Sequence, residues 1–373
     1  MTIPPRVTLV IPTLGRPEFL ARALGYYAAV APSWPILVAD SSRQDAARAN
    51  ARTASRSPSV RYRAFANDVP VGMKIARALD EVETSYAVLA ADDDFLVPRS
   101  LDAGSRWLDE HADYALVHGQ AGYVVLESGA AVHGRPVGLG RYGQRGLEQA
   151  SASARLLDHM GSYRTTFYSL QRTDALRRQW ALTASIHADY QFVELLPSCL
   201  SVIQGKARCQ KGLHMVRQGH AQQTSVTNQR RLIDWIGDAD WSRQFQAARQ
   251  LLVEALVETE GLPLHDARRV VTQAFKRYVA AKAGQPDRSE VLERVRRWGR
   301  SQSALRSAWT IAKRLMPTLP GTFSLEAWRR PYSAWYAEFR PIDRSIREAI
   351  EPVTATPTAS ADRPSAWAAP KAA

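Results

Sequence analysis

The chain has 373 residues, which is enough for one large domain and a smaller one. Hydrophobic residues make up 45% of it and ten residues are Trp, a composition typical of a folded protein. Two cysteines are too few for a disulfide framework, and no run reaches the roughly eighteen apolar residues of a membrane-spanning helix. We expect a cytoplasmic protein, either soluble or bound peripherally at the inner face of the membrane.

The formal net charge is +13, and 42 of the 49 basic residues are Arg. The planar guanidinium group suits phosphate, so this charge predicts acidic partners such as nucleotides or anionic lipid headgroups. A GC-rich genome that codes Arg in place of Lys explains the same excess. No recognised nucleic-acid-binding motif accompanies the charge, so nucleic acid is not the partner that we expect.

Strands and helices alternate through the first half of the chain. Strands are predicted at 7–12, 35–39, 59–65 and 86–91, the first a mostly apolar run typical of a strand buried on both faces, and a helical pattern follows each of them. This rhythm predicts an α/β fold with a mostly parallel sheet and helices on both faces. Ligands of such sheets bind at the carboxyl ends of the strands.

A less regular stretch follows, with short strands and a Gly-rich loop at 116–145, a helix at 149–160, a strand at 163–170 and a helix at 186–196. Beyond it the pattern is helical, over 230–259, 264–283, 289–298, 303–315 and 324–339. We therefore predict three parts: an α/β domain over 1–222, a helical C-terminal domain over 223–351 and a disordered tail over 352–373.

Three adjacent acidic residues, Asp92, Asp93 and Asp94, come directly after the fourth predicted strand. Their carboxylates would repel one another unless a positive group lies among them. Mg²⁺ or Mn²⁺ suits such oxygens and bridges to substrate phosphates, so the triplet predicts a divalent metal site. A solvated acidic turn, or a set of helix caps ahead of Pro98, is the alternative.

The opening Ile11-Pro12-Thr13, Asp40 after the second strand and the acidic triplet after the fourth resemble the nucleotide-diphosphosugar transferases of the GT-A fold, most closely glycosyltransferase family 2. The resemblance covers about 5–220 and implies a Rossmann-like GT-A catalytic domain over 1–222. It implies an inverting, metal-dependent enzyme that moves a sugar from a nucleotide diphosphate donor to a glycan, lipid-linked or protein acceptor. Bacterial polysaccharide or glycoconjugate synthesis is the setting that the family suggests.

The resemblance places the donor nucleotide against four residues of the first two strand ends. Asp40 would receive the nucleotide base, in a pocket that is also lined by Pro12, Thr13 and Arg16. Many relatives have two acidic residues at the second strand end, whereas here Ala39 precedes Asp40. A turn or N-cap role is the alternative for Asp40.

Gly72 and Lys74 open the helix that precedes the fourth strand. The N-terminus of this helix could approach the donor, and Lys74 could pair with a phosphate. An ordinary exposed Lys on a helix face is the alternative.

The family's Asp-x-Asp pattern, its DXD motif, maps onto Asp92 and Asp94. It implies that Asp94 binds the metal directly, that Asp92 lies near the ribose, and that Asp93 contacts the sugar or braces its neighbours. His220 would complete the metal shell, with His214 as the other candidate and a structural role as the alternative for both. The metal would neutralise the departing diphosphate.

An inverting transferase needs a base for the acceptor's proton. Relatives place an acidic residue on a helix about one hundred residues beyond the Asp-x-Asp, which here implies Asp189 as the base. Ala188 stands where relatives often have Glu, and Glu194 is the reserve candidate. An ordinary exposed acid is the alternative reading of Asp189.

Basic residues and aromatic residues alternate along the C-terminal helices, among them Trp298, Trp309, Trp328 and Trp335. Such a band is typical of segments that contact a membrane surface. Packing against the catalytic domain and a homodimer interface are the alternatives. Other functions also stay open: a nucleotidyltransferase, although its Gly-rich loop is missing after the first strand, a non-catalytic GT-A-like protein, or a basic nucleic-acid-binding protein.

Overall fold

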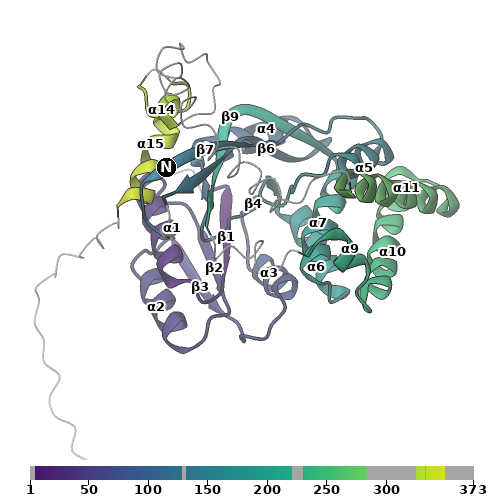
Figure 1. The fold of residues 1–373 in the computed structure, drawn as a ribbon, viewed down its shortest axis with the longest axis horizontal. Helices are drawn as coiled ribbons and strands as arrows, with labels where there is room; N and C mark the ends of the chain where they lie inside the picture. The colour runs from purple at the N-terminus through teal and green to yellow at the C-terminus, as the bar shows by residue number, and fades with distance from the viewer. Residues whose placement is uncertain (1–4, 128–131, 221–229, 284–324, 332, 349–373) are drawn as a thin grey trace, which may run out of the picture.

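The computed structural model describes residues 5–127, 132–220, 230–283, 325–331 and 333–348. These residues form one sheet with the strand order β3-β2-β1-β4-β8-β6-β9-β5, and β7 pairs with β6 (Figure 1). The strands are β1 (Val7–Thr13), β2 (Ile36–Asp40), β3 (Val60–Ala64), β4 (Tyr86–Leu89), β5 (Phe95–Leu96), β6 (Tyr114–Leu126), β7 (Pro136–Tyr142), β8 (Leu170–Arg172) and β9 (Lys206–Gly219).

The first four strands are parallel, as the sequence predicts. Side chains of β1 alternate between two apolar layers, with Leu9 and Ile11 in one and Val10 in the other. Helices α1 (Pro17–Val30), α2 (Gln44–Ala54) and α4 (Pro98–Glu110) pack on the first layer, and α3 (Val71–Leu79) and α6 (Thr173–Ser185) pack on the second. The predicted α/β class, with helices on both faces of the sheet, is confirmed, and it agrees with the GT-A resemblance.

The second half of the sheet is mixed. Strand β8 runs antiparallel to both β4 and β6, whereas β9 runs parallel to β6. The Gly-rich stretch forms the antiparallel pair β6–β7. The strand predicted at 163–170 is wrong for most of its length, because only Leu170–Arg172 joins the sheet. The residues before it are held to a neighbouring helix instead, as when the Thr166 amide donates to Ser198 Oγ at 3.3 Å.

The predicted helical region divides between two places (Figure 1). Helices α9 (Leu232–Ile236), α10 (Trp241–Glu260) and α11 (Leu264–Ala283) share an apolar core with α5 (Ala152–Gly161) and α7 (Tyr190–Gln204). Helices α14 (Leu325–Trp328) and α15 (Tyr336–Arg347) lie at the other end of the molecule, beside α1 and β7. The helices predicted at 289–298 and 303–315 and the tail at 352–373 lie outside the described residues, and the domain limits stay a prediction.

Trp328 belongs to the core and not to a surface band. It is 1% exposed and contacts the rings of Trp335 and Phe339. Its indole ring lies over Gly122 of β6, where an added Cβ would come within 2.7 Å of the ring. Trp328 therefore packs against the catalytic domain, which is the alternative to membrane contact. Trp298 and Trp309 lie outside the described residues. Within the described parts of the chain, no helix is long and apolar enough to cross a membrane.

Candidate active site

A cavity of about 810 Å³ lies at the carboxyl ends of the parallel strands. Its walls come from the end of β1 and the loop after it, the ends of β2 and β4, helix α3, the loop before β8, and helices α6 and α7. This volume is in the range of small-molecule sites, and the position is the one where sheets of this kind bind ligands. Of the predicted donor-binding residues, Pro12, Thr13, Arg16 and Lys74 line it.

The loop after β1 turns Arg16 toward the acidic triplet. Gly15 makes this turn with a φ of +67°, a left-handed conformation that favours glycine, and its amide donates to Ser42 Oγ at 2.7 Å. Pro17 then begins α1, because its fixed φ suits the first helical position. Arg16 donates from Nη1 to Asp93 Oδ2 at 2.9 Å and from Nη2 to Asp92.

Lys74 is a buried cation in the wall of the cavity. It is 3% exposed, and its Nζ donates to the Thr13 carbonyl oxygen and to Ser41 Oγ, both at 2.8 Å. Burial lowers its pKa to about 8, although Asp40 and Asp92 act in the opposite direction. Lys74 therefore still carries a charge at neutral pH, and the third proton of the ammonium group is free to meet an anionic ligand.

The triplet itself is buried behind Arg16. Asp92 Oδ2 accepts from Thr13 Oγ1 at 2.7 Å, and Asp94 accepts from Arg217 Nε at 2.9 Å and from the Gln218 amide at 3.1 Å. Burial raises the pKa of Asp92 and that of Asp94. For Asp93, burial acts in the same direction, but the hydrogen bond from His220 and the charge of Arg16 outweigh it and lower the pKa.

The predicted metal ligands do not converge on one point. His220 Nε2 hydrogen-bonds Asp93 Oδ2 at 2.9 Å, and its ring stacks on Phe19 at 4.6 Å between centroids. Oxygens of Asp92 and Asp94 are held by Arg16 and Arg217. Among the described residues, no group of three or more His, Cys, Asp or Glu side chains is arranged to hold a metal ion. The residues present therefore do not fit the divalent metal that the sequence predicts.

His214, the other candidate ligand, is part of the core. Its Nε2–H donates to the Tyr168 carbonyl at 3.1 Å, so its Nδ1 is the nitrogen that accepts from Ser100 Oγ at 3.2 Å. Burial lowers its pKa to about 4, so the ring is neutral at neutral pH. This contact pattern is that of a structural histidine.

Asp40 lies at the predicted strand end, but the cavity does not reach it. The carboxylate is 1% exposed and accepts from the Ser42 amide at 2.7 Å, and from Asn50 Nδ2 and Tyr62 Oη at 2.8 Å each. These donors use both oxygens, which is the turn role that the sequence offers as the alternative. The adjacent Ser41 lines the cavity in its place.

Gly72 also lies behind the cavity wall. An added Cβ would be 3.7 Å from Val193 and 3.8 Å from Thr183, so this glycine packs against α7 and α6. The lining residues of α3 are Val71, Lys74 and Ile75. Gly72 thus positions the helix, while Lys74, two residues later, faces the ligand space.

The two candidate bases have different surroundings. Asp189 is the N-cap of α7: its Oδ1 accepts from the Phe192 amide at 2.9 Å, and its Oδ2 accepts from Trp235 Nε1 at 2.8 Å. Glu194, one turn further along α7, lines the cavity and accepts from Thr165 Oγ1 at 3.1 Å. The contacts of Asp189 are those of a helix cap, and Glu194 is the one carboxylate among the described residues that line this cavity.

Two substitutions of Asp189 separate the cap from the base. Asn can still cap the helix by accepting from the Phe192 amide, but its NH2 group then faces Trp235 Nε1–H, so Asp189→Asn is expected to preserve the rate of catalysis with some loss of stability. Asp189→Ala loses the cap and is expected to reduce the free energy of unfolding by about 1–2 kcal/mol. Chemical denaturation and a transfer assay on both variants test this. A large loss of turnover in folded Asp189→Asn would return the base role to Asp189.

An aromatic wall, which the sequence does not predict, completes the cavity. Phe167 and Tyr168 precede β8, Trp180 lies on α6 and Tyr190 begins α7. Such rings offer flat faces on which a nucleotide base can stack. The four aromatic residues within 167–190 were visible in the sequence, but that they line one cavity depends on the loop before β8, which the sequence predicts as a strand.

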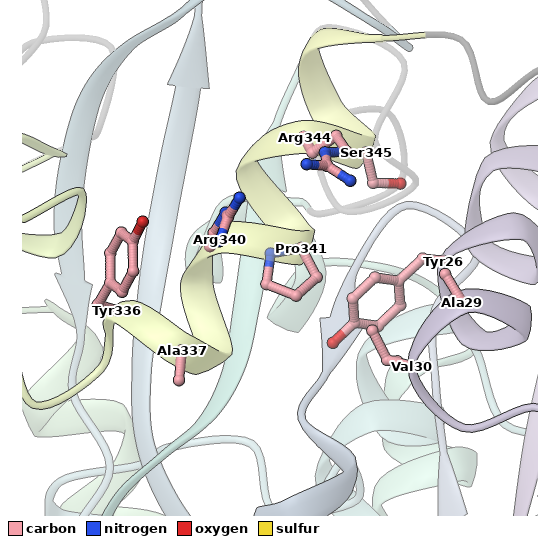
Figure 2. A pocket seen from close by; sticks show the side chains of 9 residues that line it. All are labelled: Tyr26, Ala29, Val30, Tyr336, Ala337, Arg340, Pro341, Arg344 and Ser345. Atoms are coloured by element: carbon pink, nitrogen blue, oxygen red, sulfur yellow. The ribbon is translucent and has the colours of Figure 1, made fainter. Parts of the chain in front are cut away.

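A second cavity of about 560 Å³ lies between α1 and α15 (Figure 2). Tyr26, Ala29 and Val30 come from α1, and Arg340 and Arg344 are among the residues that line it from α15. Its described lining residues include no carboxylate that could act as a base. The larger cavity is therefore the candidate active site.

No family model matches this chain, and no curated protein is similar to it. Its fold is similar to that of solved structures at 12% sequence identity. Residues 1–349 of S. aureus TarS give a TM-score of 0.48 over 74% of this chain and 72% of that one. The same protein in complex with UDP-GlcNAc gives a TM-score of 0.42 over 76% of this chain and 93% of that one. A mycobacterial protein gives a TM-score of 0.34 over 69% of this chain and 76% of that one. Similarities at this level assign no activity and no residue role to this chain.

Proposed function

We propose that this chain is an inverting glycosyltransferase that uses a nucleotide diphosphate sugar as its donor. The observation that carries the proposal is the composition of the 810 Å³ cavity. Among the described residues that line it are two cations, Arg16 after β1 and Lys74 on α3, a group of aromatic rings, and one carboxylate, Glu194. A diphosphate needs the cations, a nucleotide base suits the rings, and an acceptor hydroxyl needs the base.

The proposed reaction is a single displacement. The carboxylate of Glu194 takes the proton of the acceptor hydroxyl, the hydroxyl oxygen forms a bond to the anomeric carbon, and the bond from that carbon to the diphosphate oxygen breaks. The nucleoside diphosphate leaves with the electron pair, and Arg16 and Lys74 stabilise its negative charge. A single carboxylate among the described lining residues suits this one-step path, because a double displacement through a carboxylate would need a second one as the nucleophile.

The affinity for the diphosphate is expected to depend on pH through Lys74. Its pKa is about 8 in the free protein, where Asp40, Asp92 and Arg16 are the charged groups around it. Above pH 8 the free protein has lost this proton and must recover it to bind an anion, so affinity should fall by up to about tenfold per pH unit. Titrations with the nucleoside diphosphate between pH 7 and pH 9.5 test this. The Lys74→Met variant is expected to bind more weakly, with an affinity that does not change over this pH range. A flat profile in the unaltered protein would exclude Lys74 from the phosphate site.

Calorimetric titration with UDP, GDP, CDP and dTDP tests the proposed donor class. We expect one of them to bind with one-to-one stoichiometry, and the matching monophosphate to bind at least about tenfold more weakly, because it lacks the phosphate that pairs with Arg16 and Lys74. UDP-GlcNAc, the ligand named for TarS, is the first intact donor to include. Equal affinity for monophosphates and diphosphates, or no binding at all, would contradict the proposal.

A further inference from the structure

The charges around Asp92, Asp93 and Asp94 are already balanced by the chain. Arg16 and Arg217 hold the three carboxylates in ion pairs. Arg22, which is 2% exposed, donates to the backbone carbonyl of Asp93 at 3.0 Å and brings a third guanidinium. The formal charge of the triplet is thus matched within the protein. A triplet without these partners would need an external cation, whereas this one does not.

A divalent ion could reach the triplet only by displacing these partners. The side chains of Arg16 and Arg217 are each 18% exposed, and those of Asp92 and Asp94 are 0% and 2% exposed. A displaced guanidinium would lose its carboxylate in a place where water solvates it poorly. The Thr13 hydroxyl and the Gln218 amide occupy further carboxylate oxygens. Each carboxylate of the triplet therefore already has hydrogen-bond donors that match its charge.

Arg16 connects the triplet with the ligand space. It contacts Asp92 and Asp93, and it also lines the 810 Å³ cavity together with Lys74. A guanidinium group has five N–H donors in a planar fork, so Arg16 can hold two carboxylates and still donate to phosphate oxygens. Arg217 is held in a similar way, since Asp94 binds its Nε and its guanidinium lies 5.4 Å from the ring centroid of Tyr168, a residue of the cavity wall.

We propose that donor binding in this chain does not require a divalent metal. The N–H donors of Arg16 that its two carboxylates do not use, together with the charged ammonium group of Lys74, meet the diphosphate. The acidic triplet positions Arg16 and Arg217 and does not coordinate a metal ion. This inference rests on the proposed nucleotide-sugar function and deepens it, because it names the groups that neutralise the diphosphate. It differs from the metal-dependent pattern that the Asp-x-Asp resemblance implies.

The test is a calorimetric titration of the full chain with the nucleoside diphosphate that binds, once in EDTA and once with Mn²⁺ or Mg²⁺. We expect dissociation constants that agree within about threefold. An affinity that rises about tenfold or more with the metal would overturn the inference while leaving the proposed function in place. Absence of binding in both conditions would remove the proposed function and the inference with it, so the two failures are distinguishable.

Two variants extend the test. Arg16→Gln is expected to weaken binding in EDTA by at least about tenfold, and unchanged affinity would overturn the role of Arg16. The control is Arg6→Gln, which removes an exposed ion pair with Asp109 away from the cavity and should bind like the unaltered chain. Asp94→Asn removes the ion pair with Arg217, and any change in affinity should be the same in EDTA and in Mn²⁺. A loss confined to Mn²⁺ would identify Asp94 as a metal ligand and overturn the inference.

Discussion

Replacing Glu194 with Gln is expected to lower the turnover number by about 10²–10⁴-fold, the range that general base catalysis contributes. The amide has nearly the same shape but cannot take the acceptor's proton. The affinity for the nucleoside diphosphate should stay unchanged, because Arg16 and Lys74 supply the phosphate contacts. The rate of nucleoside diphosphate release, measured with titrations of the same samples, separates the two quantities.

Asp189→Asn is the matched control for this variant. It makes the same change of carboxylate to amide five residues away, on the same helix, but at a side chain that caps the helix and does not line the cavity. If Glu194→Gln kept normal turnover while Asp189→Asn lost it, the assignment of the base would be reversed.

Replacing Arg22 with Met is expected to reduce the free energy of unfolding by about 3–5 kcal/mol, the usual cost of removing one charge from a buried ionic group. Arg22 donates to the backbone carbonyls of Asp93 and Val132 and to Gln218 Oε1, and burial lowers its pKa only to about 10, so it remains charged at neutral pH. Its removal would leave the triplet with less positive charge and three acceptors without their donor.

Chemical denaturation measures this loss, with Arg48→Met as the control. Arg48 forms an ion pair with Asp45 on the surface of α2, with 69% and 89% of the two side chains exposed. Such a change should alter stability by no more than about 0.5 kcal/mol. A loss for Arg22→Met as small as the loss for Arg48→Met would contradict the account of a charge-balanced triplet.

Strands β1, β2 and β4 were predictable because each is buried on both faces and therefore reads as an apolar run, whereas the half-exposed β3 followed from the alternation of strands and helices. Their ends brought Thr13, Arg16 and the triplet to one edge of the sheet, so the position of the site followed from the sequence. The position and length of β8 could not be predicted from the sequence, because three residues are too few to show a periodic hydrophobic pattern. Helix α6 was not predicted from the sequence.

The pairing of charges could not be predicted, because it depends on residues distant in sequence. Arg16 meets Asp93 across 77 positions, and Arg217 meets Asp94 across 123. An acidic run looks the same in a sequence whether a metal or an Arg neutralises it. The sequence also could not separate Asp189 from Glu194 as candidate bases, because the contacts of Asp189 come from the C-terminal helices. Trp235 Nε1 donates to its carboxylate, and its backbone amide donates to Gln244 Oε1.

A crystal structure of the chain with its sugar nucleotide would test the central claim most directly. The account predicts the ligand in the 810 Å³ cavity, with the diphosphate within hydrogen-bonding distance of Arg16 and Lys74 and the sugar on the side of Glu194. A ligand found elsewhere, for example between α1 and α15 beside Arg340 and Arg344 (Figure 2), or a diphosphate without contact to Arg16 and Lys74, would contradict it.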